Sequence, residues 1–195
     1  MGIALISSSN NTLANNTASN NNDDGIYLCS SSNNTLTSNT ASNNTDYDFY
    51  SDESSHDNVV EDLTIASYPT TISFTYDNGV GIAGVETAPP DPADKPNISK
   101  YVNATNVSAN SWLLLNVNYE ESDVSTVSEY CLKMYRHNGT AWEEVPGSEA
   151  NTAENYVWAN ITSFSIFAPL GGSIATIPTA TGSGNTIIET SSGYF

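Results

Sequence analysis

Four acidic residues follow one another closely and are of the type that binds calcium: Asp46, Asp48, Asp52 and Glu53. Calcium takes several carboxylate or carbonyl oxygens, so a turn that gathers such groups is a candidate site. No EF-hand loop or glycine-rich calcium repeat surrounds these residues. A solvated acidic turn is therefore the simpler interpretation, and weak calcium binding is the alternative that the pattern leaves open.

Basic residues are scarce, and their scarcity restricts the available chemistry. The chain has 4 Lys plus Arg against 22 Asp plus Glu, which gives a formal net charge of −18. Such a charge repels nucleic acid and anionic lipid, so we expect no nucleic-acid partner. A polysaccharide lyase would need a basic residue beside its carboxylates, yet all four basic residues lie after residue 90: Lys95, Lys100, Lys133 and Arg136. We expect a protein that is not an enzyme, with carbohydrate binding or cleavage as an alternative.

Asparagine followed two positions later by Ser or Thr is the glycan acceptor sequence of exported proteins. A chain this rich in Asn, Ser and Thr creates several such sequences by chance. The four that fall in predicted loops of the second half are the glycosylation candidates: Asn97, Asn103, Asn106 and Asn138.

The two cysteines, Cys29 and Cys131, permit one disulfide, and the sequence leaves their pairing open. They form no metal motif of the C-x-x-C type. No apolar run approaches the roughly 18 residues of a membrane-spanning helix, so we expect no transmembrane segment.

An internal repeat must position the residues of the first third. IALISSSNNTL at residues 3–13 returns as IYLCSSSNNTL at 26–36, and NTASNN at 16–21 returns at 39–44, always 23 residues later. A fixed period of this size is typical of a solenoid. Alternating apolar residues between Asn- and Ser-rich turns predict three short strands per coil, and hence a short parallel β-helix.

The repeat predicts three coils of 23 residues, at 3–25, 26–48 and 49–71. In the third coil, a shift of 23 places Phe49 under Ile26, Val59 under Leu36 and Leu63 under Thr40. Stacking also places equivalent asparagines above one another, where their amides form ladders. The expected pairs are Asn10 over Asn33, Asn16 over Asn39, and Asn20 over Asn43. Because the first coil would leave open strand edges and no signal peptide precedes it, we expect that further coils precede Met1 in a longer protein.

Residues 66–170 change in character and favour an antiparallel β-sandwich. Short apolar runs alternate with turn residues throughout this segment. The runs at 71–76 and 80–85, joined by Asp77-Asn78-Gly79, predict a hairpin. From residue 171 to 195, Gly, Ser, Thr and Pro predict a flexible tail. The sequence thus predicts an all-β chain with β-helix repeats at 1–65, a β-sandwich at 66–170 and a tail at 171–195.

Two parts of the chain resemble known families. GIYLCSSSNNTLTSNTASNN at residues 25–44 resembles the right-handed β-helix repeats of NosD-like surface proteins in methanogenic archaea. Residues 66–170 resemble the PGF-pre-PGF domain that follows such repeats there. Its marks stand at residues 111–113, 134–136, 142–146 and 161–168. The resemblance implies an exported, glycosylated archaeal envelope protein at the cell surface. In that family a stalk and a C-terminal sorting helix usually follow, and no such helix occurs before Phe195.

The NosD resemblance also raises the question of copper. Copper sites need His, Cys or Met grouped together, and these residues form no spaced cluster: His56, His137, Met134, Cys29 and Cys131. We therefore expect no cofactor. We expect a non-enzymatic structural or adhesion protein of the cell surface, whose partners are envelope components, other surface proteins or carbohydrate. The alternatives are a carbohydrate-binding or polysaccharide-cleaving β-helix and a calcium-dependent surface assembly module.

Overall fold

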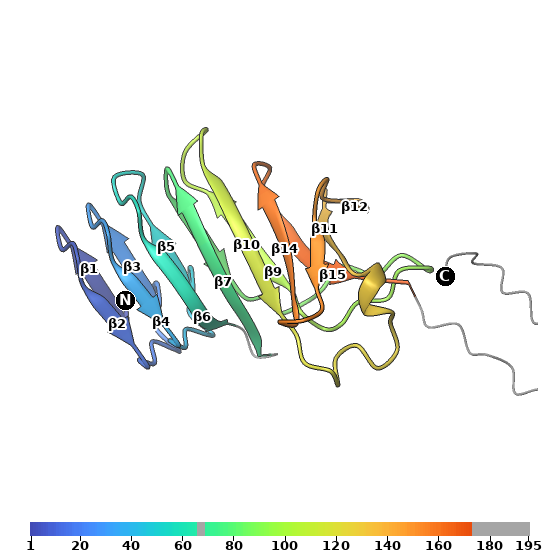
Figure 1. Ribbon diagram of the computed structural model, residues 1–195. Coiled ribbons are helices and arrows are strands. Elements are labelled where there is room, and N and C mark those ends of the chain that lie inside the picture. The colour runs from blue at the N-terminus through green and yellow to red at the C-terminus, as the bar shows by residue number, and fades with distance from the viewer. Residues whose placement is uncertain (66–68, 173–195) are drawn as a thin grey trace, which may run out of the picture.

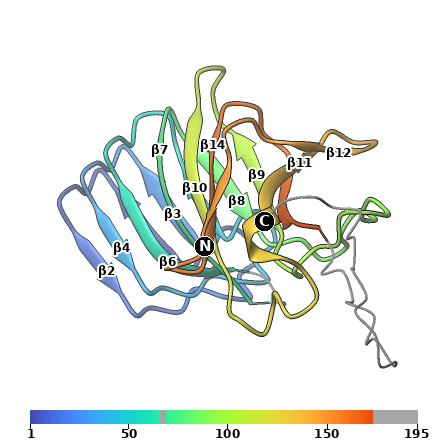
Figure 2. The same cartoon turned by 45° about the vertical axis from the view of Figure 1, so that its right-hand side comes forward.

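The computed structural model of the protein describes residues 1–65 and 69–172. Apart from Gly171 and Gly172, the predicted tail at 171–195 lies outside the described residues. The described chain is all-β, as predicted, and its two mixed sheets form facing layers (Figures 1 and 2). Its single helix is the short 3₁₀ helix η1 (Glu129–Cys131). Among the residues that the structure describes, no helix is long and apolar enough to cross a lipid bilayer.

The larger sheet has eight strands, in the order β1-β3-β5-β8-β9-β15-β11-β12. Their bounds are β1 (Ile3–Ile6), β3 (Ile26–Cys29), β5 (Phe49–Ser51), β8 (Val80–Ala83), β9 (Val102–Asn106), β15 (Ile166–Leu170), β11 (Lys133–His137) and β12 (Trp142–Glu144). The smaller sheet has seven strands, in the order β13-β14-β10-β7-β6-β4-β2. Their bounds are β13 (Glu149–Asn151), β14 (Tyr156–Ile161), β10 (Trp112–Asn118), β7 (Thr70–Asp77), β6 (Val59–Ile65), β4 (Thr35–Thr37) and β2 (Thr12–Ala14).

The repeats stack as parallel strands in both sheets. In the larger sheet Ile3 pairs with Ile26 and Ile26 with Phe49, which is the predicted offset of 23. In the smaller sheet Leu36 pairs with Val60 rather than Val59, so the predicted alignment there is wrong by one residue. The third side of each coil consists of isolated bridges, in which Thr40 contacts Thr17 and Thr64.

The shift arises from one extra residue in the turn after β5. Ser8 N donates to Ser31 Oγ across 23 positions, whereas Ser31 N donates to Ser55 Oγ across 24. The Asp52 carboxylate closes the longer turn by accepting the Ser55 hydroxyl at 2.6 Å. A register slip of one residue turns a strand's side chains over, so the insertion is what buries Val60.

In each pair of adjacent asparagines, the two residues have different structural roles. The first residue turns the chain through the left-handed region, with φ of 61° at Asn10 and 56° at Asn33. The second residue forms the ladder: Asn34 Oδ1 accepts from Asn11 N at 2.9 Å, and Asn34 Nδ2 donates to Ser8 O at 3.1 Å. Asn34 is 1% exposed, and its amide satisfies backbone groups of the neighbouring coil.

One of the three predicted asparagine ladders is therefore confirmed, and the other two are formed by neighbouring asparagines. Asn39 Oδ1 accepts from Asn16 N at 3.0 Å, so the predicted stack of Asn16 over Asn39 is confirmed. The ladders expected at Asn10 and Asn20 run one residue further along the chain, as with Asn21 N, which donates to Asn44 Oδ1 at 3.0 Å.

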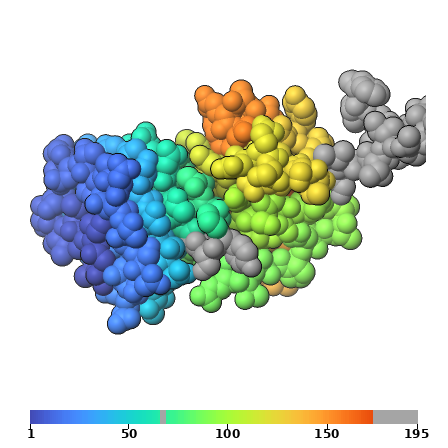
Figure 3. All heavy atoms as spheres, turned by 90° about the horizontal axis from the view of Figure 1, so that it is seen from below, coloured from blue at the N-terminus to red at the C-terminus, as the bar shows by residue number. Residues whose placement is uncertain are grey.

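Both sheets continue from the coils into the antiparallel strands. β5 pairs with β8, joining Phe49 to Ile82, and β6 pairs with β7, joining Val60 to Phe74. One cluster of buried apolar residues extends from Ala18 to Phe167. Figure 3 accordingly shows the blue coil residues passing without a break into the green and yellow ones. The segments predicted as repeats and as a sandwich share both sheets and one core.

The predicted hairpin between residues 71–76 and 80–85 is wrong. β7 lies in the smaller sheet and β8 in the larger, so the connection between them crosses from one layer to the other. Asn78 and Gly79 have φ of 60° and 78°, which makes the corner tight. A Cβ on Gly79 would lie 2.8 Å from Ser51 O, so close packing against the last coil requires glycine here.

In the second half, β11 and β12 form a hairpin around the Asn138-Gly139 turn, with His137 opposite Trp142. Cys29 and Cys131 are both free thiols, which answers the question of their pairing.

Candidate functional site

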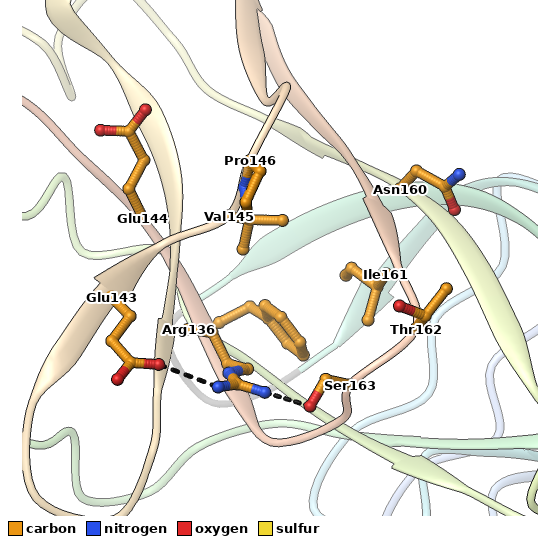
Figure 4. A pocket seen from close by; sticks show the side chains of 10 residues that line it. Arg136, Glu143, Glu144, Val145, Pro146, Asn160, Ile161, Thr162 and Ser163 are labelled. Atoms are coloured by element: carbon orange, nitrogen blue, oxygen red, sulfur yellow. Dashed lines mark hydrogen bonds and ion pairs between the residues drawn. The ribbon is translucent and has the colours of Figure 1, made fainter.

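A cleft of about 470 Å³ lies where the two sheets meet, near the far end from the coils (Figure 4). Its lining comes from β11, from β12 and the turn after it, from the end of β14 and the turn after it, and from β15. We call it the Arg136 cleft, and its polar members are Arg136, Glu143, Glu144, Asn160, Thr162 and Ser163. Val145, Ile161 and Phe167 form its apolar part.

Arg136 is the central polar group of the cleft. Its guanidinium donates to Glu143 Oε2 at 2.9 Å and to the Ser163 hydroxyl, as the dashed lines in Figure 4 show. The Asn138 amide donates to Glu143 Oε1 at 2.6 Å. The hydrogen bond from Arg136, followed by that from Asn138, lowers the pKa of the Glu143 carboxyl.

This arrangement suits binding better than catalysis. Arg136 remains protonated, so it cannot remove a proton from Ser163 and make it a nucleophile. The guanidinium and the Glu143 carboxylate together present donors and acceptors with no net charge. Residue spacing does not predict this site, because Arg136 and Ser163 are 27 positions apart. Both residues nevertheless stand in segments that carry the PGF-pre-PGF resemblance, at 134–136 and 161–168.

A second polar group lies at a corner of the coils. The carboxylate oxygens of Asp23, Asp24 and Asp46 lie within 4.8 Å of one another. Asp24 is only 7% exposed, and its Oδ1 accepts from Tyr47 N at 3.2 Å. Burial, and then the charge of Asp23, raise the pKa of Asp24. Within the described ranges this is the only group of three or more His, Cys, Asp or Glu side chains that a metal ion could join.

The four predicted calcium ligands do not gather at this corner. Only Asp46 lies there, because β5 separates Asp46 and Asp48 from Asp52 and Glu53. Asp48 is buried and accepts from the Asn44 amide at 3.0 Å and from Gly84 N at 2.8 Å. It thereby joins the second coil to the chain that follows β8.

Asp52 is committed to the turn after β5. Burial acts to raise the pKa of Asp52, but hydrogen bonds from the Ser55 hydroxyl and the Ser30 backbone N–H outweigh it and lower the pKa. The exposed Glu53 follows it in the same turn.

The four predicted glycosylation candidates all lie in the antiparallel half. Asn138 is exposed in the β11–β12 turn. Asn103 and Asn106 belong to β9 rather than to a loop, and Asn106 at its end is exposed. Asn97 is half-buried, and its amide donates to the Asp91 carboxylate.

Stacked parallel coils with internal amide ladders, continued by antiparallel strands, define a solenoid-like all-β protein. Residues 1–88 match a family model whose description reads Periplasmic copper-binding protein (NosD). This match supports a NosD-like character for that part of the chain. Comparisons with curated proteins and with solved structures found no match.

The copper in that family description does not fit the side chains found here. His56 Nδ1 lies 2.8 Å from Asp77 Oδ1, and His137 Nδ1 accepts from Gly139 N at 3.2 Å. Met134 is fully buried in the core. In the described part of the chain the one potential metal cluster contains only aspartates, whereas copper prefers imidazole and sulfur ligands.

Proposed function

We propose that the chain is a non-enzymatic structural or adhesion protein of the cell surface. The observation that carries this proposal is the continuity of the two sheets around one core. An unbroken pair of sheets forms a stiff element with a row of coils at one end and irregular loops at the other. Such a shape suits the display of a binding face at a distance.

The finer features of the proposal come from the family resemblance. They are a right-handed three-coil β-helix, a PGF-pre-PGF-like second part, an archaeal and extracellular setting, and glycans at the four asparagine candidates. The partners would be envelope components or other surface proteins. A match of residues 1–88 to a family described as periplasmic agrees with an exported protein.

Two assays on the purified chain test the proposal. We expect saturable binding to isolated archaeal envelopes, measured by sedimentation. We also expect no release of reducing or unsaturated ends from neutral or acidic polysaccharides. Release of ends that the Arg136→Gln substitution abolishes would identify an enzyme instead and overturn the proposal.

A second candidate function, calcium-dependent assembly, is favoured by the corner formed by Asp23, Asp24 and Asp46. Calcium accepts carboxylate oxygens, and a bound ion would offset the repulsion that raises the pKa of Asp24. If this candidate is right, chelator lowers the melting temperature, and Asp24→Asn removes that sensitivity. A melting temperature indifferent to both calcium and chelator excludes it.

A further inference from the structure

The outer face of the smaller sheet carries exposed apolar side chains where β10 lies beside β14. Trp112 and Leu114 on β10 are each 38% exposed. Leu114 pairs with Asn160 and Asn116 with Trp158, so these side chains all belong to the outward-facing positions of the two strands. Tryptophan is enriched at binding surfaces, because its ring offers a large apolar face and its N–H a hydrogen-bond donor.

Trp112 lines a hollow of about 470 Å³, which we call the Trp112 groove. Its lining residues are Ala109, Asn110, Ser111, Trp112, Asn160 and Thr162. Asn160 and Thr162 also line the Arg136 cleft, so the two hollows adjoin. Figure 4 shows these two side chains on the opposite side of the cleft from Glu143 and Glu144. Together the hollows form one trench with an indole at one end and a guanidinium at the other.

The charges of the trench select among ligands. All six residues that line the Trp112 groove are uncharged. In the neighbouring cleft Arg136 is paired with Glu143 at 2.9 Å, and Glu144 adds one carboxylate that can accept from hydroxyl groups. The whole chain carries a net charge of −18, which repels acidic polymers and a second copy of itself. The groove itself offers no carboxylate to a basic ligand. A neutral ligand rich in hydroxyl groups matches this lining.

We propose that the trench binds a neutral oligosaccharide. The C–H face of one sugar residue packs against the Trp112 indole, and its hydroxyls meet the Asn160 amide and the Thr162 hydroxyl. A neighbouring sugar residue reaches the Arg136 cleft, where Arg136 donates and Glu143 accepts. Because two adjoining hollows are involved, the ligand has more than one sugar residue. This inference rests on the proposed adhesive function and assigns it a ligand class and a site.

Asn160 begins an Asn-Ile-Thr acceptor sequence, and a glycan there would compete for the trench. Binding is therefore tested with the unglycosylated chain, produced in a bacterial host. The probes are cellotetraose, maltotetraose, mannotetraose and chitotetraose. Isothermal titration calorimetry measures the binding of each. We expect at least one of them to bind, and Trp112→Ala to weaken that binding by about tenfold or more. Trp112→Tyr retains a ring and should restore part of the affinity. Arg136→Gln should weaken binding severalfold.

Tyr130→Ala is the matched control, because Tyr130 is 85% exposed on η1 and does not line the trench. Its affinity should stay within about twofold of the wild type. The melting temperature of each variant confirms that it folds. Failure of all four oligosaccharides to bind, equal binding by Trp112→Ala, or preference for polygalacturonate would each overturn the inference. If the wild type binds envelopes but none of the oligosaccharides, only this inference fails. If the wild type does not bind envelopes, the proposed function itself is contradicted.

Discussion

The coil half, residues 1–65, and the antiparallel half, residues 69–172, share two sheets but are stabilised by different side chains. Inside the coils, Ser31, Asn34 and Asn58 are at most 1% exposed and hydrogen-bond from coil to coil. Inside the antiparallel half, the buried positions of β10 and β14 are apolar, as at Leu115 and Val157. Buried polar side chains thus recur from coil to coil in one half, whereas in the other they are confined to Thr70, Ser111 and Ser148 among the described residues.

This difference shows why richness in asparagine is a poor guide to function here. In the coils an amide that recurs with the repeat hydrogen-bonds to backbone groups. Its donors and acceptors are then already paired and are not available to a ligand. In the antiparallel half the apolar core leaves Asn160, Thr162 and Arg136 free to line a trench. The candidate site for an organic ligand therefore belongs to the half without repeats.

The largest expected effect is the loss of a core side chain from the antiparallel half. Leu115 is fully buried on β10, opposite Phe74 and Ala159. Leu115→Ala should lower the free energy of unfolding by about 3 kcal/mol, because it removes buried apolar surface and leaves a cavity. Leu114→Ala, at an exposed neighbouring position, should cost less than about 1 kcal/mol. Urea unfolding measures both, and equal losses would contradict the assigned facing of β10.

A comparable effect in the coils should come from an amide. Asn34→Ala leaves the Asn11 N–H and the Ser8 carbonyl without their buried partner, and should cost about 2–3 kcal/mol. Asn33→Gly is the matched control, because glycine adopts the left-handed angle of Asn33 readily, and its cost should stay below about 1 kcal/mol. The two variants alter adjacent residues, so urea unfolding distinguishes the loss of a ladder amide from a change at the left-handed corner of the coil. A harmless Asn34→Ala would refute the structural role of the ladders.

The repeat predicts much of the coil half because identical residues require identical pairing, as Ile3 and Ile26 show. The extra residue before Ser55 could not be predicted, because the third coil lacks the repeated residues that would reveal the insertion. Turn residues such as Asn78 determine local backbone angles but not the partner strand. The sequence therefore predicts a hairpin where the chain crosses from β7 in one sheet to β8 in the other. The trench joins Trp112 and Asn160 of the smaller sheet with Arg136 of the larger, and only the packing of the two sheets brings these residues together.

A smaller effect of opposite sign is expected at the acidic corner. Asp24→Asn keeps an oxygen for the Tyr47 N–H and removes the charge that burial and Asp23 disfavour. It should raise stability at pH 7 by up to about 1 kcal/mol. Since the native pKa of Asp24 lies above its unfolded value, the wild type regains this difference as the pH falls through the native pKa. Melting temperatures from pH 7 to 4 test this, with Asp62→Asn, at an exposed position of β6, as the control.

The smallest effect is expected from Asp52. Its native pKa lies below the ordinary value of 3.8, so its stabilising contribution is present above that value and is lost as the pH falls through the native pKa. Asp52→Asn should therefore flatten the acid limb of the stability curve. We expect a change of less than about 1 kcal/mol at pH 7. An acid limb that is unchanged in the variant would show that Asp52 does not contribute to it.

The central claim is that coils and antiparallel strands form one body, and one unfolding experiment tests it most directly. All three tryptophans, Trp112, Trp142 and Trp158, lie in the antiparallel half, whereas far-ultraviolet circular dichroism reports both halves. In urea, Asn34→Ala should shift the fluorescence and dichroism midpoints together to lower concentration, because the damaged coil shares its sheets and core with the tryptophans. A fluorescence midpoint that stays at the wild-type value, while dichroism shows an earlier phase, would contradict the account.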